Sequence, residues 1–159
     1  MSEQYKELLK IRRQRELTKT LRANKEKELL KEAQLREEKA KEELEEFSDF
    51  KNARQSEIYS TNTGAETDRR QIEKDRSEMF LMKEKQHIKE QSVTQAKKNT
   101  AQQEQVWEEA REKRVDEARG VQKFKHLLDN HKEQARKEFE RSEEKKVEEI
   151  PHARLQSQR

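Results

Sequence analysis

The sequence predicts an all-α fold, a long antiparallel two-helix coiled-coil hairpin, on three observations. The chain has 159 residues, of which 46% are charged and 28% are hydrophobic, which is too little apolar surface for a globular core of this size. Helix breakers are nearly absent, with two Gly and one Pro. Turn-forming residues gather at one internal stretch, 60–68. A disordered polyampholyte would share this charge content, but the remaining residues are rich in Gln, Leu and Ala, which favour helix.

The stretch 60–68 is interpreted as the bend of the hairpin. Asn62 and Gly64 can adopt a left-handed backbone and end a helix, and Thr63 and Glu66 have the spacing of a capping box. We therefore expect one elongated helical domain over 1–159, with arm one at about 1–60, the bend at about 61–67 and arm two at about 68–150. Because proline disrupts a helix interior, Pro151 is predicted to end the regular helix, leaving 151–159 as a tail.

Each arm carries a narrow seam whose residues recur at steps of three and four, as in a coiled coil. In arm one the predicted seam is Leu30, Ala33, Glu37, Ala40, Leu44, Phe47, Lys51, Arg54 and Ile58. In arm two it is Ile72, Met79, Met82, Gln86, Val93 and Ala96, and then Trp107, Ala110, Arg114, Ala118, Val121, Phe124, Leu128, His131, Ala135 and Phe139. Gly120 lies inside the second arm and is interpreted either as a tolerated helical glycine or as a hinge.

Folding the chain at residues 63 and 64 predicts the register of the two arms. It pairs residues whose numbers add to about 127, since both arms rise equally per residue. The predicted apolar pairs are Phe47 with Phe80, Leu44 with Met82 or Lys83, and Leu21 with Val106 and Trp107. Residues beyond about 126 then have no partner in arm one, although they keep an apolar stripe of Leu127, Leu128, Ala135 and Phe139. This stripe predicts a partner, either a second copy or another protein.

The residue inventory predicts neither catalysis nor a cofactor or metal site. Two glycines cannot build a phosphate-binding loop, and the four histidines (His87, His126, His131 and His152) lack the spacing of a helical metal pair. The net charge of +3 comes from finely mixed signs, which is poor evidence for nucleic-acid binding. The chain contains no cysteine, and it shows no apolar signal segment or bilayer-length run. We therefore expect a cytosolic protein that is peripheral to a membrane at most.

One short segment, Met79-Phe80-Leu81-Met82, is the candidate docking patch. Four consecutive helical residues sweep about 300°, so one partner helix can cover only part of them. The segment is either one thick patch of seam or a partly exposed binding surface, for which methionine-rich apolar residues are well suited. On the predicted register, Phe80 and Met82 are structural and Leu81 points outward.

Three stretches resemble a known family. They are the basic, leucine-bearing opening Leu8–Arg15, the segment Phe47–Lys51 running into Arg54 and Glu57, and Gln122–Leu128 followed by a Glu-rich end. Together they resemble the YscO-like family of type III secretion stalk proteins, which is related to the flagellar FliJ protein. The likeness covers nearly the whole chain.

The resemblance implies a function and partners. Family members are cytosolic helical hairpins that resemble the stalk of rotary ATPases, associate with the hexameric secretion ATPase and connect it to the export gate protein in the inner membrane. They also bind secretion chaperones, and a stalk is expected to be mainly monomeric when free. The family tendency places the termini towards the ATPase, which implies contacts by Leu8, Leu9, Ile11, Leu127 and Leu128. It places the bend towards the gate, which implies contacts by Met79, Phe80, Leu81 and Met82.

Two other classes remain open at this stage. A structural coiled-coil scaffold would share the composition, and it would form stable dimers or assemble with other helical proteins. A peripheral stator-like stalk of a rotary ATPase would also be helical, although it would normally carry a globular head or a membrane segment.

Overall fold

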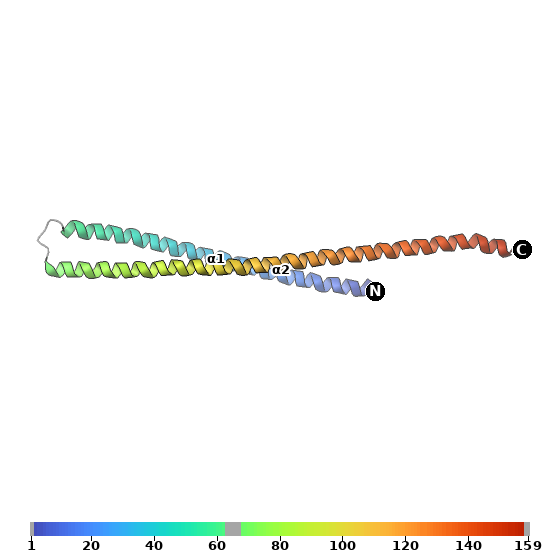
Figure 1. The fold of residues 1–159 in the computed structure, drawn as a ribbon, viewed down its shortest axis with the longest axis horizontal. Coiled ribbons are helices and arrows are strands. Elements are labelled where there is room, and N and C mark those ends of the chain that lie inside the picture. The colour runs from blue at the N-terminus through green and yellow to red at the C-terminus, as the bar shows by residue number, and fades with distance from the viewer. Residues whose placement is uncertain (1, 63–67, 158–159) are drawn as a thin grey trace. The chain divides into compact units, whose positions relative to one another are not determined.

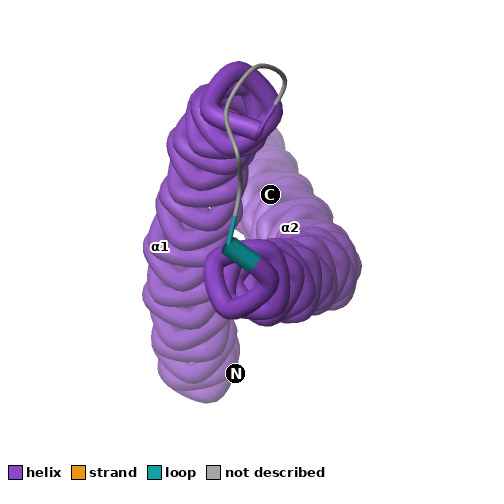
Figure 2. The backbone as a smooth tube through the Cα atoms, turned by 90° about the vertical axis from the view of Figure 1, so that its left-hand side faces the viewer, coloured by secondary structure: helices purple, strands orange, loops and turns teal. Residues whose placement is uncertain are grey.

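The computed structural model describes residues 2–62 and 68–157, which form two α-helices. Helix α1 spans Ser2–Asn62 and α2 spans Arg69–Ser157. Figure 2 shows both helices in purple, and the described residues contain no strand. The all-α prediction is therefore confirmed. The predicted turn residues Thr63, Gly64 and Glu66 lie outside the described residues, and Asn62, the last residue of α1, does not have a positive φ.

Asp68 begins the second helix. Its backbone carbonyl accepts hydrogen bonds from the backbone N–H groups of Gln71 and Ile72, at 2.9 and 3.2 Å. Its side-chain Oδ1 accepts one from the N–H of Arg70 at 3.4 Å. An aspartate at this position satisfies N–H groups of the first turn that have no partner within the helix. Asp68 is therefore the N-cap of α2.

The end of α2 differs from the prediction. The helix continues through Pro151 to Ser157, so the expectation that Pro151 ends the regular helix is wrong. A proline inside a helix removes one backbone hydrogen bond and costs about 3 kcal/mol. The residues on either side of Pro151 still form their own helical hydrogen bonds, and the chain continues in the same conformation.

The helices pack within two compact units. Unit 2 comprises Arg22–Ala110, and in it α1 and α2 run antiparallel as a helical hairpin (Figure 1). Side chains that contact across this hairpin show that the helices are antiparallel, because the residue numbers of the contacts rise along α1 as those of their partners on α2 fall. These pairs are Glu26 with Gln103, Ala33 with Thr100, Lys51 with Gln86, Arg54 with Glu78, and Asn62 with Asp75.

The predicted seam of α1 is confirmed in unit 2. All nine predicted positions from Leu30 to Ile58 are buried or half-buried, while their neighbours are mostly exposed. On α2 the buried or half-buried positions are Asp75, Glu78, Met79, Met82, Gln86, Lys89, Val93, Ala96, Thr100, Gln103, Trp107 and Ala110. Ile72, which was predicted in this seam, is 38% exposed because the polar Asp75 takes the buried position beside the start of α2.

The predicted register is wrong. The Phe47 ring faces Lys89, whose Nζ lies 5.7 Å from the ring centroid, rather than Phe80, which is 63% exposed. Leu21 and Val106, which were also predicted as partners, are both exposed. Polar pairs such as Arg54 with Glu78 meet across unit 2 in the observed register, and the apolar pairs chosen from the sequence did not anticipate them.

Unit 1 comprises α1 up to Leu21 together with α2 from Arg111. Its core is a cluster of Leu9, Val121 and Leu128, against which Tyr5 and Phe124 pack. Leu128 was predicted to lie in the unpaired part of arm two, but it is 6% exposed, and His131 still contacts Tyr5. The unpaired part of α2 therefore starts later than predicted. Within unit 1, every residue from Asp129 to Ser157 whose side chain is described is exposed, which includes the predicted seam residues His131, Ala135 and Phe139.

Candidate partner-binding sites

The candidate docking patch is divided by the unit 2 seam. Met82 is 5% exposed and Met79 is half-buried, so both belong to the seam. Phe80 and Leu81 are 63% and 56% exposed. The expectation that Phe80 is structural is wrong, because its predicted partner Phe47 lies against Lys89. The outward position predicted for Leu81 agrees with its exposure. Phe80 and Leu81 are thus the members of the patch that remain available to a partner.

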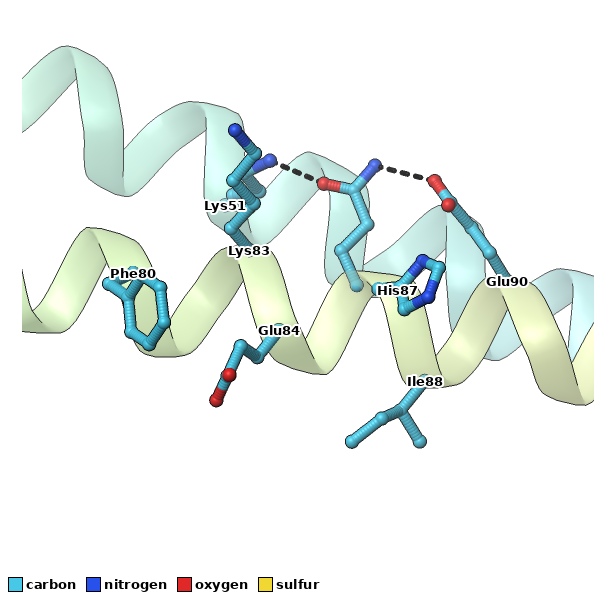
Figure 3. A pocket seen from close by; sticks show the side chains of 8 residues that line it. Lys51, Phe80, Lys83, Glu84, His87, Ile88 and Glu90 are labelled. Carbon is cyan, nitrogen blue, oxygen red and sulfur yellow. Dashed lines mark hydrogen bonds between the residues drawn. The ribbon is translucent and has the colours of Figure 1, made fainter.

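Ile88 extends this exposed surface along α2 and was missed in the sequence. It lies seven residues after Leu81, so these two fall about 20° apart on nearly the same face of the helix, and it is 62% exposed. Phe80, Glu84 and Ile88 line a pocket with Lys51 of α1, and Glu84 and Ile88 point away from α1 (Figure 3). The seven-residue spacing of Leu81 and Ile88 was the signal that could have identified this face.

A short polar chain borders the same pocket. Lys51 Nζ donates a hydrogen bond to Gln86 Oε1, and Gln86 Nε2 donates one to Glu90 Oε1 at 3.2 Å (Figure 3). The hydrogen bond from Lys51 to Gln86 connects α1 to α2 within unit 2. The exposed apolar residues therefore lie beside polar side chains, as the apolar core of a protein interface lies beside its polar rim.

The candidate residues of unit 1 also divide into two groups. Leu9 and Leu128 are buried in the hydrophobic cluster, so their side chains stabilise the packing of α1 on α2. Leu8, Ile11 and Leu127 are 48%, 46% and 63% exposed. These three are the predicted residues of unit 1 that a partner can reach.

Aromatic contacts build the rest of the unit 1 cluster. The Tyr5 ring lies 6.1 Å from the Phe124 ring and 5.3 Å from the His131 ring, centroid to centroid. The guanidinium of Arg12 lies over the Phe124 ring, with Cζ 5.5 Å from the centroid. Arg12 also passes close to Gly120, where an added Cβ would lie 3.1 Å from Arg12 Nη1. The sequence offered no signal for this contact, because it depends on the register of unit 1.

Ion pairs shift the pKa values of three carboxyl groups. Hydrogen bonds from Arg54 are the main cause that holds the pKa of Glu78 below its usual value. A hydrogen bond from Lys41 does the same for Glu37, and one from Lys137 for Glu133. The pairs of Glu37 and Glu133 connect residues four apart on one helix, whereas Arg54 and Glu78 connect α1 to α2. Of these three ion pairs, only Arg54 with Glu78 therefore contributes directly to the packing of α1 against α2.

Two further kinds of site concern the described side chains and helices, namely a metal site and a membrane-spanning segment. No group of three or more His, Cys, Asp or Glu residues there is placed to hold a metal ion. No described helix is long and apolar enough to span a membrane.

Comparison with known proteins places the chain in a family. The family model of the type III secretion protein YscO matches residues 5–152, which is nearly all of the chain. The chain belongs to the YscO family. The resemblance drawn from the sequence is thereby confirmed, and this YscO-family chain is a type III secretion protein. No curated protein and no solved structure matches the chain.

Proposed function

We propose that this YscO-family protein is a non-enzymatic central stalk that couples the export ATPase of a type III secretion system to the export gate protein. It acts in the bacterial cytoplasm, at the base of the secretion apparatus, and it also binds secretion chaperones. The observation that carries the proposal is the family match over residues 5–152.

Exposed apolar residues in both units support a coupling role. A protein that connects two partners needs two contact surfaces, and each seam leaves such residues uncovered. In unit 2 these are Phe80, Leu81 and Ile88, which we assign to the gate. In unit 1 they are Leu8, Ile11 and Leu127, which we assign to the ATPase.

The charged surface suits partners that bind and release. The exposed ion pairs, such as Lys31 with Glu28 and Arg136 with Glu140, connect neighbouring turns of one helix. Pairs of this kind contribute little stability and are screened by salt. The charged residues around the apolar contacts therefore remain solvated. Binding then depends on a few apolar side chains that become buried in the complex, rather than on a large apolar interface.

The test measures binding of the purified protein to the ATPase hexamer and to the export gate protein separately. Leu81→Asp is expected to reduce gate binding by about ten- to a hundredfold and to leave ATPase binding unchanged, because burying one leucine contributes about 1.5–3 kcal/mol. Leu127→Asp is expected to reduce ATPase binding by a similar factor and to leave gate binding unchanged. Leu35→Asp is the matched control, since Leu35 is 58% exposed in unit 2 and lies outside both surfaces.

Secretion in cells gives the second readout. Leu81→Asp and Leu127→Asp should each abolish secretion while helix content and melting stay close to those of the wild type, whereas Leu35→Asp should secrete normally. Stable variants that secrete normally would refute the assignment of these surfaces. Failure of the wild-type protein to bind either partner would refute the coupling function.

A structural scaffold is the second candidate, and the exposed end of α2 favours it. Phe139, Val147 and Ile150 are each more than half exposed, and such residues can pair with a second copy. Sedimentation distinguishes the two functions. A scaffold forms dimers at micromolar concentration, whereas the stalk is mainly monomeric.

A further inference from the structure

The Arg12 guanidinium in unit 1 lies against an aromatic ring rather than a carboxylate. It lies over the Phe124 ring of α2, and the missing side chain of Gly120 leaves it room. Among the described residues, no Asp or Glu forms an ion pair with Arg12. A guanidinium that lies over an aromatic face leaves its in-plane N–H donors free to meet a carboxylate side-on. Arg12 is thus available as an anion contact.

The neighbours of Arg12 make a basic and apolar surface, which we call the Arg12 face: Leu8, Ile11, Arg12, Arg15 and Lys19. Each of them lies three or four residues from another member of the set on α1, so they are neighbours on the helix surface. Ile11, Arg15 and Lys19 line a pocket that also includes Glu117 of α2. Leu8 and Ile11 are about half exposed. Arginine is among the residues enriched at protein interfaces.

Positive charge is concentrated around this face. Residues 2–21 contain six Lys or Arg against three Asp or Glu, and residues 111–131 contain six against four. This part of unit 1 has a net charge of +5, whereas the whole chain has +3. The excess positive charge of the protein therefore resides here, and an acidic partner is attracted to it.

We propose that the Arg12 face binds an acidic segment of a partner protein, with Arg12 as its central carboxylate contact and Gly120 as the residue that positions Arg12. This goes beyond the coupling function because it specifies the chemistry of the contact, whichever protein supplies it. The partner segment places an Asp or Glu carboxylate against the guanidinium and aliphatic side chains against Leu8 and Ile11.

Two other anionic partners fit less well. An anionic bilayer favours helices whose apolar residues share one face, but Leu17, which is 59% exposed, lies on the side of α1 opposite to Leu8. Nucleic acid favours an unbroken basic stripe, which Leu8 and Ile11 interrupt.

The experiment measures binding of the full chain to fluorescent poly-L-glutamate by anisotropy at several salt concentrations. Arg12→Gln should weaken binding about tenfold, because it removes a charge-assisted contact. Arg13→Gln, which removes the same charge about 100° further around α1, should weaken it no more than about twofold. Gly120→Ala keeps every charge and should weaken binding by an intermediate factor, because its Cβ displaces the guanidinium.

Circular dichroism verifies that each variant remains helical, and Arg12→Lys provides a second test that keeps the charge without the planar fork. Equal losses for Arg12→Gln and Arg13→Gln, together with no effect of Gly120→Ala, would overturn the proposal in favour of diffuse electrostatic attraction. Vesicles containing phosphatidylglycerol and a single-stranded oligonucleotide are tested in parallel. Tighter binding of either one, with the same dependence on Arg12, would also overturn it.

Discussion

Arg54 of α1 forms a bidentate ion pair with Glu78 of α2 through two hydrogen bonds. Arg54 Nε donates to Glu78 Oε1 at 2.8 Å, and Arg54 Nη2 donates to Glu78 Oε2 at 3.1 Å. Arg54 also donates from Nη1 to Glu57 Oε2 at 2.9 Å. A bidentate arginine–carboxylate pair has a specific geometry, so it opposes sliding of one helix along the other. Within unit 2 this pair therefore acts on the register as well as on stability.

The Arg54–Glu78 pair predicts how stability depends on pH. Arg54 lowers the pKa of Glu78 below 4.5 in the folded protein. The stabilisation is therefore fully present above the unfolded pKa and is lost as the pH falls through the folded pKa. We expect Glu78→Gln to melt at a lower temperature than the wild type at neutral pH. The difference in melting temperature should shrink as the pH falls below 4.5 and through the lower folded pKa.

Thermal melts followed by circular dichroism at a series of pH values measure this difference. Glu73→Gln is the matched control, because Glu73 pairs with Arg69 at 3.6 Å on the exposed surface of α2. Its difference from the wild type should be small at every pH. A constant difference between Glu78→Gln and the wild type across the acid range would contradict the prediction.

Met82 and Phe80 should respond differently to truncation. Met82 is 5% exposed in the seam, so Met82→Ala is expected to lower the free energy of unfolding by about 2 kcal/mol through lost burial and a cavity. Phe80 is 63% exposed, and Phe80→Ala should change it by less than about 0.5 kcal/mol. Urea denaturation measures both values. Equal losses would place Phe80 in the seam, as the register predicted from the sequence required.

The contrast between Phe80 and Met82 shows what the sequence could reveal. Steps of three and four in the apolar pattern determine which face of a helix is buried, so the α1 seam from Leu30 to Ile58 was predictable. The register depends on which residues meet across the seam. In a chain that is 46% charged, opposite charges can pair in many registers, so the Arg54–Glu78 pair could not be singled out.

The same limit applies to the partner-binding residues. Leu81 was placed outward from the predicted register, which is wrong, and its exposure agrees with that prediction because Met79 and Met82 occupy the seam instead. The spacing of the arm-two seam placed Leu128 rather than Leu127 inside it, but the sequence did not separate Leu9 from Leu8, since these two residues are adjacent and equally apolar. Packing in unit 1 decides between them, burying Leu9 and Leu128.

Hydrogen exchange should locate the end of the packed part of unit 1. Leu128 is buried and His131 contacts Tyr5, whereas the described side chains from Lys132 to Ser157 are all exposed. We expect slow amide exchange around Leu128 and fast exchange beyond Lys132 in the free monomer, because an unsupported helix opens easily. Mass spectrometry of peptic fragments provides the measurement. Strong protection beyond Lys132 in a verified monomer would mean that this segment packs on another part of the chain.

Gly120 provides the sharpest test of a single position. Glycine inside a helix costs about 1 kcal/mol relative to alanine, so Gly120→Ala should raise the free energy of unfolding by up to that amount. The added Cβ would meet Arg12 Nη1 at 3.1 Å, but this atom is the end of a flexible side chain and can move aside. The gain should therefore persist, and urea denaturation measures it. Ala118→Gly, at a half-buried position on the same helix, is the reciprocal control and should lower stability by a similar amount. If Gly120 is instead a hinge, Gly120→Ala will abolish secretion while Arg12→Gln will not, because only the first change stiffens α2.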